Sequence, residues 1–342
     1  MTATGVRLGR YRITRALTRA AFVYRHPMLE QTLAGIHFTN PIGLAAGFDK
    51  NAQLTATLPQ VGFGFAEVGS ITGEPCAGNA PPRLHRLPHS KSLLVYYGLK
   101  NDGARAITER LRDKHFAIPI GMSIAKTNNR ATCDTDNGIQ DYAKAFSHVA
   151  NLGAYTTINI SCPNTFGGEP FTDPDRLERL LSRLDQLPTT KPIFIKLAPD
   201  LDMDTLDSLI AVAEQHRVQG YICSNLTKNR NNPLIKDQVP TYGGLSGKVV
   251  EPLANKLLAR VYQQAPGKII IGCGGVFSAE DAYKKIRLGA SLVQLITGMI
   301  YQGPQLIGQI NQGLVRLLKR DGYKNISQAI GVDNPAKSRR HV

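Results

Sequence analysis

The 342-residue sequence is poor in acidic residues and has no long hydrophobic run. It carries 41 Lys and Arg against 26 Asp and Glu, which gives a formal net charge of +15 with His neutral. No stretch of about 18 apolar residues is present, and this argues against a membrane-spanning helix. The five cysteines are odd in number and lack C-x-x-C spacing, so neither a disulfide framework nor a zinc or other metal site is predicted. A cytoplasmic protein in a reducing compartment fits these features.

The excess of positive charge has three interpretations: nucleic-acid binding, contact with an anionic membrane surface, or a solvated surface with small anionic ligands. Six arginines precede the first acidic residue, Glu30. Leu17, Ala20 and Tyr24 recur among them at helical spacing, which predicts a basic amphipathic segment within residues 1–36. This segment could lie on the inner face of a membrane as a peripheral contact, act as a transit peptide, or pack as a solvated helix on the main domain.

From residue 41 onward, short apolar runs alternate with segments of helical periodicity. The apolar runs cover residues 42–48, 63–72, 118–125, 155–161, 192–198, 220–225, 268–275 and 292–298. The helical segments cover residues 102–116, 139–152, 175–187, 204–216, 251–264 and 279–288. The two wide gaps, residues 73–101 and 226–248, are long enough to be loops that cover the barrel mouth. Apolar strands that alternate with helices predict a parallel sheet covered on both faces. The sequence therefore predicts an α/β protein, a (β/α)8 TIM barrel over residues 37–321 with a basic N-terminal helical extension and a tail over 322–342.

Polar residues and glycines follow the predicted strands, at the carboxyl ends where active sites of this fold lie. These positions include Lys50, Ser70, Ser123, Asn159, Lys196, Ser224, Gly274, Gly275, Thr297 and Gly298. The glycines after the last two strands bring backbone N–H groups to the place where the fold commonly binds phosphate. The alternative is that these glycines only form tight turns. Of the two, the more specific prediction is that these glycines bind the phosphate of an organic cofactor.

A lysine and a cysteine at two other strand ends are the candidate catalytic residues. Lys196 places a cation near the barrel axis, where it needs a negative partner, either a flavin that becomes anionic on reduction or Glu67. The sequence N-I-S-C-P-N at 159–164 places the thiol of Cys162 between two amides. A thiol can act as a base, and amides recognise planar ligands that carry donors and acceptors. The alternative for Cys162 is a thiol that merely packs.

Seven segments occur in order along the chain: N-P-I-G-L-A-A-G-F-D-K (40–50), P-P-R-L-H-R-L (81–87), I-N-I-S-C-P-N-T (158–165), I-K-L-A-P-D-L (195–201), G-G-L-S-G (243–247), G-C-G-G-V (272–276) and G-A-S-L-V-Q-L (289–295). Their order and spacing resemble the dihydroorotate dehydrogenase family. The segment D-G-Y-K-N-I-S-Q-A-I-G at 321–331 resembles the quinone-linked class of that family in particular.

The resemblance implies an FMN enzyme that oxidises a CH–CH bond of dihydroorotate to give orotate in pyrimidine biosynthesis. Cys162 would be the base, and Lys196 would stabilise the reduced flavin. The implied cofactor contacts are Ala46, Gly47, Lys50, Ser70, Ser123, Asn159, Lys196, Ser224, Gly247, Gly275, Thr297 and Gly298. The implied substrate contacts are Lys50, Val95, Tyr97, Gly98, Leu99, Asn159, Asn164, Asn225 and Leu226. A small-molecule substrate and a quinone or other electron acceptor are the expected partners, and nucleic acid is not expected.

Several features depart from the family pattern. Cys162 resembles the soluble class, because the quinone-linked class generally has Ser there. Val95, Tyr97 and Leu226 stand where the family has Asn, Met and a hydroxyl side chain, and each hydrogen bond lost to a charged group is worth about 1.5–3 kcal/mol. The N-terminal extension is also short for a two-helix quinone tunnel.

Three alternatives follow from these departures and from the charge. The first is a family member that desaturates a different, less polar, amide-containing substrate. The second is an enzyme like the dihydrouridine synthases, which are basic FMN barrels with an N-x-x-C-P motif that act on transfer RNA. The ordered long-range segments disfavour this second reading. The third is a non-catalytic barrel that binds flavin or lipid, and the set of Lys50, Cys162 and Lys196 argues against it.

Overall fold

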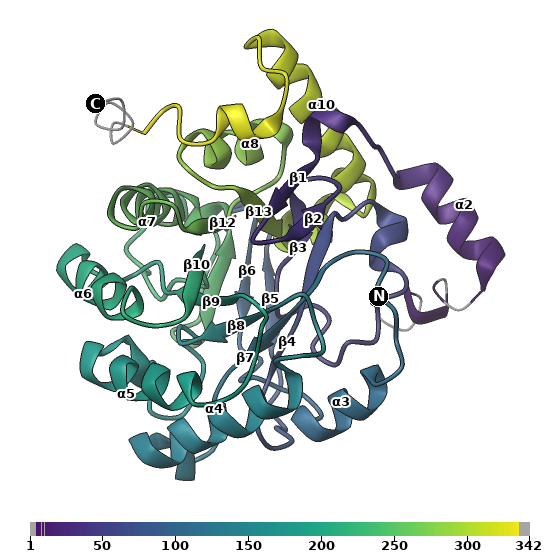
Figure 1. The fold of residues 1–342 in the computed structure, drawn as a ribbon. Coiled ribbons are helices and arrows are strands. Elements are labelled where there is room, and N and C mark those ends of the chain that lie inside the picture. The colour runs from purple at the N-terminus through teal and green to yellow at the C-terminus, as the bar shows by residue number, and fades with distance from the viewer. Residues whose placement is uncertain (1–4, 8, 10, 335–342) are drawn as a thin grey trace.

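The centre of the molecule is a closed barrel of eight parallel strands (Figure 1). The computed structural model describes residues 5–7, 9 and 11–334, so Arg10 and residues 335–342 of the predicted tail lie outside the described part. The barrel strands are β3 (Ile42–Leu44), β4 (Phe65–Ile71), β7 (Ile120–Ile124), β8 (Tyr155–Asn159), β9 (Ile193–Leu197), β10 (Val218–Cys223), β12 (Ile269–Cys273) and β13 (Leu292–Leu295). Each of the eight predicted runs overlaps one of them, and the predicted (β/α)8 barrel is confirmed.

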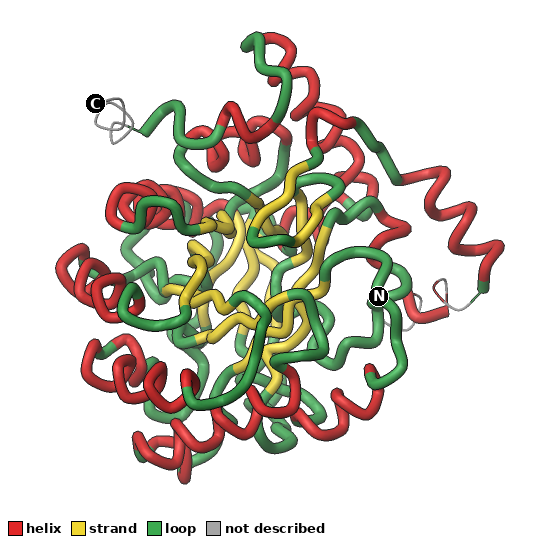
Figure 2. The backbone as a smooth tube through the Cα atoms, in the orientation of Figure 1, coloured by secondary structure: helices red, strands yellow, loops and turns green. Residues whose placement is uncertain are grey.

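Helices surround the barrel, as Figure 2 shows. They are α3 (Ala104–Leu111), α4 (Thr135–Val149), α5 (Pro174–Asp185), α6 (Met203–Ala213), α7 (Glu251–Gln264), α8 (Ala279–Arg287), α9 (Thr297–Gln302) and α10 (Gln305–Arg320). Capping side chains fix where several of them begin. Asp173 accepts a hydrogen bond from the Arg176 N–H at 3.0 Å, and Ser278 accepts one from the Asp281 N–H at 3.2 Å. Each cap satisfies a backbone donor that the first helical turn leaves unpaired.

An apolar cluster fills the end of the barrel opposite the strand carboxyl ends. A hairpin of β1 (Gln31–Leu33) and β2 (Ile36–Phe38) lies across this end (Figure 1). From it, Phe38 packs edge-on against Phe65 of β4, with ring centroids 5.5 Å apart. Phe38 belongs to one buried cluster with Tyr155, Phe194 and further barrel residues. The hairpin therefore closes this end, and the other end remains for the site.

Two segments that the sequence suggests as loops form a sheet over the barrel mouth. β5 (Leu84–Leu87), β6 (Ser92–Val95) and β11 (Gly244–Gly247) pair antiparallel in the order β11-β6-β5. They come from the predicted loops 73–101 and 226–248. We call these three strands the lid sheet. Interpreting both segments as loops was wrong. The strands leave little signal in the sequence, because each is only four residues long and β11 pairs with a strand far away in the sequence.

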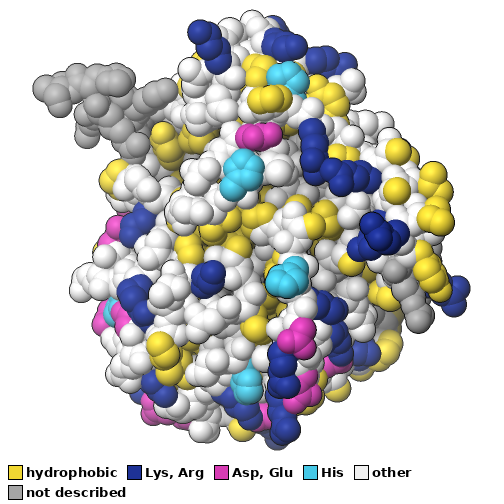
Figure 3. All heavy atoms as spheres, turned by 45° about the vertical axis from the view of Figure 1, so that its right-hand side comes forward, with side chains coloured by type: hydrophobic (Ala, Val, Ile, Leu, Met, Phe, Trp, Pro, Cys, Tyr) yellow, Lys and Arg dark blue, Asp and Glu magenta, His cyan; other side chains and the backbone are white. Residues whose placement is uncertain are grey.

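The predicted N-terminal helix is α2 (Arg12–Phe22), which packs against residues 58–61 and α10. The solvent-facing side of α2 carries large apolar side chains: Ile13 is 76% exposed and Leu17 is 67% exposed. Figure 3 shows hydrophobic side chains beside Lys and Arg on this side of the molecule. None of the helices in the described part of the chain is long and apolar enough to cross a membrane.

Candidate active site

A cavity of about 290 Å³ lies at the carboxyl ends of the barrel strands, beneath the lid sheet. Both predicted catalytic residues, Cys162 and Lys196, line this cavity. All the residues predicted to contact substrate line it as well: Lys50, Val95, Tyr97, Gly98, Leu99, Asn159, Asn164, Asn225 and Leu226. Side chains from widely separated parts of the sequence thus meet at one place, as the closed barrel requires.

A smaller cavity of about 80 Å³ adjoins the first, and Ala46, Lys196 and Thr297 line both. Its other walls include the glycine turns after β12 and β13 and residues after β10: Ser224, Gly274, Gly275 and Gly298. Gly274 and Gly275 have φ angles of 110° and 79°, which L side chains rarely adopt. The turn and the cavity wall are therefore the same structure, and it can hold an anion against bare backbone.

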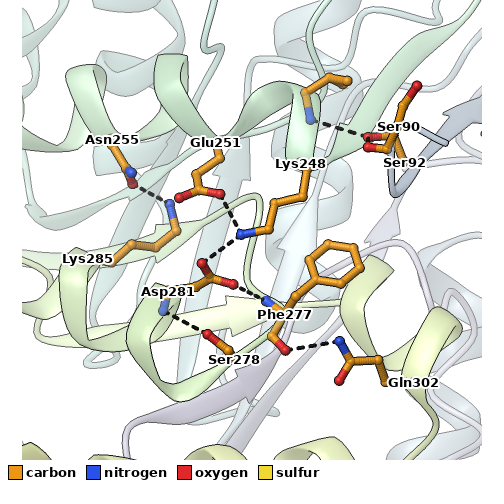
Figure 4. A network of polar contacts seen from close by, with 11 residues as sticks. Ser90, Ser92, Lys248, Glu251, Asn255, Phe277, Ser278, Asp281, Lys285 and Gln302 are labelled. Carbon is orange, nitrogen blue, oxygen red and sulfur yellow. Dashed lines mark hydrogen bonds and ion pairs between the residues drawn. The ribbon is translucent and has the colours of Figure 1, made fainter. Parts of the chain in front are cut away.

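A network of polar contacts joins Lys248, Glu251 and Asp281 (Figure 4), and Glu251 lies directly against the glycine turn. A Cβ atom on Gly275 would lie 2.3 Å from the Cβ of Glu251, the first residue of α7. Glu251 is fixed in turn by Lys248, whose Nζ donates at 2.7 Å to Glu251 and at 2.6 Å to Asp281 of α8. Asp281 also accepts a hydrogen bond from the Phe277 N–H at 2.8 Å. The two helices and the turn are thereby held in one arrangement.

A chain of hydrogen bonds links four of the predicted site residues. The Ser70 and Ser123 hydroxyl oxygens lie 2.9 Å apart, and the Asn159 amide donates to Ser70 at 2.8 Å. The Asn225 amide donates to Asn159 Oδ1 at 3.2 Å. Ser123 lines neither cavity and acts behind Ser70. These bonds fix the Asn159 amide beside Lys196, its register partner on β9.

Lys196 is almost completely buried, with 4% of its surface exposed. Within the described residues its ammonium donates no hydrogen bond and forms no ion pair. Glu67 forms neither a hydrogen bond nor an ion pair with Lys196, and its Oε1 accepts a hydrogen bond from Thr157 at 2.7 Å. Burial raises the pKa of Glu67 and the charge of Lys196 lowers it; burial has the larger effect and favours the neutral carboxyl group. The buried ammonium on two cavity walls therefore has no direct ion-pair partner in the described residues, and an anionic ligand would supply one.

Lys50 lies on another side of the larger cavity, against an aromatic ring. Its Nζ donates to the Gly47 carbonyl and lies 3.9 Å from the centroid of the Tyr97 ring. Burial lowers the pKa of Lys50 to about 8. Tyr97 therefore stabilises the charged form of Lys50 through a cation–π contact, at the position where the family pattern has Met.

Cys162 lies on the segment that follows β8 and is partly exposed on the cavity wall. Burial raises the pKa of its thiol to about 11, and the Asn164 N–H, Lys126 and Lys196 oppose this shift. The Asn164 side chain donates to the Val95 carbonyl at 2.9 Å, which ties this segment to the lid sheet. The thiol is thus held at the cavity in its protonated form, and nearby cations favour its loss of a proton.

One side of the cavity is apolar, and the sequence indicates only part of it. Leu84, Leu93, Ile296 and Ile300 line the cavity beside Val95 and Leu226, and sequence reasoning names none of these four. Ser246 is also missed; it lines both cavities, and its Oγ lies 2.9 Å from Thr297 Oγ1. Ser246 lies in the G-G-L-S-G segment, which the sequence analysis links to the family. From this segment only Gly247 is predicted as a cofactor contact, and Gly247 lines neither cavity.

These residues fit FMN. A Cβ on Gly47 would meet only Ile296, at 3.9 Å, so the cavity is open beside this backbone. Lys196 provides an unpaired cation, and the turn at Gly274 and Gly275 provides a cradle for a phosphate. A (β/α)8 barrel with these features is suited to bind FMN, as an FMN-dependent oxidoreductase does.

Comparisons with known proteins identify the family. The family model for dihydroorotate dehydrogenase matches residues 28–318. The dihydroorotate dehydrogenase (quinone) of Haloarcula marismortui is 40% identical over 322 residues, which cover 92% of this chain and 91% of the relative. That of Gloeobacter violaceus is 38% identical over 314 residues, 91% of this chain and 88% of the relative. The crystal structure of the Eimeria tenella enzyme with ferulenol has a TM-score of 0.83 and 29% identity, and covers 94% of both chains. The chain belongs to the dihydroorotate dehydrogenase family.

Membership of this family confirms the predicted activity and cofactor. The protein is an FMN-dependent oxidoreductase that acts on a CH–CH group and oxidises dihydroorotate to orotate in pyrimidine biosynthesis. The comparisons give no support to a different substrate or to an enzyme that acts on transfer RNA. Val95, Tyr97 and Leu226 are therefore departures within a site that keeps its reaction.

Replacing Tyr97 tests its contact with Lys50. Tyr97→Leu removes the ring over the ammonium, and Tyr97→Phe keeps it. A cation–π contact of about 0.5–2 kcal/mol corresponds to a rise of roughly twofold to thirtyfold in KM for dihydroorotate in the leucine variant. Steady-state kinetics should show little change in kcat, and the phenylalanine variant should behave like the wild type. Equal KM values for the two variants would show that the ring does not act through Lys50.

Replacing Lys285 of α8 tests the cost of burying its charge. Lys285 is completely buried, its Nζ donates to Asn255 at 2.7 Å, and burial lowers its pKa to about 8 from 10.5 in the unfolded chain. The unfolded state therefore binds more protons between these pH values, so stability should rise with pH across this window, by at most about 3 kcal/mol. Urea unfolding at a series of pH values should show this rise in the wild type and lose it in Lys285→Met. A rise of the same size in the variant would assign it to other groups.

Proposed function

We propose that this chain passes the electrons of dihydroorotate to a quinone, and that Cys162 and Lys196 perform the catalysis. The observation that carries the assignment is the meeting of Lys50, Cys162 and Lys196 on one cavity beside the glycine turn. When bound, FMN accepts the hydride that leaves the substrate. The curated relatives are named quinone enzymes.

The protein residues divide the work at the substrate. Cys162 Sγ takes a proton from one carbon of the CH–CH group as the hydride leaves the neighbouring carbon. Lys50 binds the substrate carboxylate, and the amides of Asn159, Asn164 and Asn225 orient the ring through its donors and acceptors. Lys196 stabilises negative charge that develops at the cofactor. The apolar wall at Leu84, Leu93 and Ile300 provides a side from which an apolar quinone can approach.

Anaerobic mixing of the yellow holoenzyme with dihydroorotate tests the role of Cys162. The wild type should lose its flavin absorbance rapidly, and Cys162→Ala should lose it at least about a hundredfold more slowly, because the general base is gone. Cys133→Ala is the matched control, because that thiol is exposed on the turn Ala131–Cys133 outside the cavity. A Cys162→Ala rate equal to that of the control would remove Cys162 from the mechanism.

Re-oxidation of the reduced wild type tests the electron acceptor. Addition of a soluble quinone should restore the flavin absorbance faster than fumarate or NAD does. A faster recovery with fumarate or NAD would refute the proposal that a quinone is the acceptor.

We further propose that α2 lies on the cytoplasmic face of a membrane as a peripheral contact. Its exposed Ile13 and Leu17 would enter the interface, and the exposed Arg12 and Arg19 would meet anionic headgroups. The free cysteines fit a cytoplasmic location. This placement would bring the protein to a lipid-soluble acceptor.

Liposome flotation tests this membrane contact. The wild type should float with vesicles that contain anionic lipid, and the double variant Ile13→Asp, Leu17→Asp should remain at the bottom of the gradient, because charge on the apolar face opposes insertion. Leu234→Asp is the control, because Leu234 is exposed on a different segment. Equal flotation of the double variant and the wild type would refute the proposal.

A further inference from the structure

A lysine outside the predicted site holds the segment that carries Cys162. Lys126 follows β7 and is 3% exposed. Its Nζ donates to the Phe166 carbonyl at 2.8 Å, and Asn128, two residues later, accepts a hydrogen bond from the Phe166 N–H at 2.8 Å. The residues after β7 therefore hold both sides of Phe166, four residues beyond the thiol. This fixes the position of the Cys162 segment relative to the barrel.

The ammonium of Lys126 forms no ion pair in the described part of the chain. The titratable groups whose charges act on it are Cys133, Cys162 and Asp141, in that order of effect. Asp141 accepts hydrogen bonds from the Thr127 N–H at 2.6 Å and from the Thr127 hydroxyl at 2.8 Å. The charge of the buried ammonium therefore acts on two thiols, and Cys162 is the one that lines the active-site cavity.

The surroundings of Cys162 show why this charge matters. The titratable groups that face its thiol are Lys126, Lys196, Glu169 and Tyr142. Glu169 opposes the thiolate, and burial raises the pKa of Tyr142, whose hydroxyl donates to the Asn159 carbonyl at 2.8 Å and stays neutral. The remaining two are cations, and Lys196 faces the cofactor cavity. Lys126 is therefore the cation available to the thiol from the side of β7.

We propose that Lys126 is a positioning residue for Cys162, whose ammonium holds the segment through Phe166 and favours the thiolate by its positive charge. The inference rests on the proposed role of Cys162 as the base. An opposite charge close to an ionisable group in a buried site favours the charged form, by about one to three pKa units. Without Lys126, a thiol whose pKa burial raises to about 11 would be deprotonated still more rarely at neutral pH.

Alkylation of the holoenzyme without substrate tests this proposal independently of turnover. The rate at which iodoacetamide modifies Cys162, followed by mass spectrometry of its peptide, reports the thiolate. Lys126→Gln keeps an N–H donor for Phe166 and removes the charge, so its rate between pH 7.5 and 9 should fall about tenfold. Lys126→Arg keeps the charge and should stay within about twofold of the wild type. Lys191→Gln removes an exposed charge before β9 and should change nothing.

The pH dependence of Cys162 alkylation provides a second test, which compares the wild type only with Lys126→Arg and needs no variant that removes the charge. Burial lowers the pKa of Lys126, so the wild type should lose the helpful charge as the pH rises, whereas arginine keeps it. At the alkaline end of the series the alkylation of Cys162 should therefore be faster in Lys126→Arg than in the wild type. Coincident profiles would overturn the proposal, as would a wild-type rate in Lys126→Gln. Lys126→Met removes both the charge and the N–H donor for Phe166. If alkylation were slow in this variant but normal in Lys126→Gln, Lys126 would only hold the segment, and the proposed effect of its charge would be refuted.

Flavin bleaching separates this proposal from the assignment of the base. Lys126→Gln should slow reduction by dihydroorotate about as much as it slows alkylation, and Lys126→Arg should restore it. If Cys162→Ala bleaches at the rate of the wild type, the assignment of Cys162 as base fails, whatever the alkylation shows. If Cys162→Ala is slow but Lys126→Gln is not, the base stands and the role of Lys126 is overturned.

Discussion

Closure of the parallel sheet is the constraint on which the site depends. Val293, Gln294 and Leu295 of β13 pair with Ile42, Gly43 and Leu44 of β3, and this pairing joins the last barrel strand to the first. Only a closed sheet brings all eight carboxyl ends to one rim. The hairpin of β1 and β2 then seals the opposite end with Phe38, so that the rim at the carboxyl ends is the end of the barrel left for the site. Cavity, glycine turn and cations all follow from this geometry.

The sequence predicts the barrel well because its evidence is local. Apolar runs, helical periodicity and the caps at Asp173 and Ser278 are each readable within a few residues, and the fold makes strand ends into neighbours. Pairing between distant segments leaves no such local signal, so the lid sheet appears only as loops. For the same reason Ser246 and the apolar residues Leu84 and Leu93 are missed, since their place in the cavity depends on that sheet.

Three lysines, two buried and one half-buried, explain more of the chemistry than the net charge does. Lys50, Lys126 and Lys196 each lie near the cavity, and within the described part of the chain none of them forms an ion pair. Each is stabilised differently: the half-buried Lys50 by an aromatic ring and a backbone carbonyl, Lys126 by a backbone carbonyl alone, and Lys196 by neither. A low-dielectric site with several cations and few acids favours anions of every kind, the substrate carboxylate, the cofactor phosphate and the thiolate among them.

The lid sheet has a consequence for how the molecule assembles. Ser92 of β6 pairs with Gly247 of β11, a partner more than one hundred residues away along the chain. Closing so long a loop costs conformational entropy, and earlier formation of the intervening barrel strands reduces that cost. Contacts between residues so far apart in the sequence slow folding. The roof of the cavity therefore exists only when two distant parts of the chain meet, and a change that weakens the pairing at either strand also opens the cavity that the barrel forms beneath it.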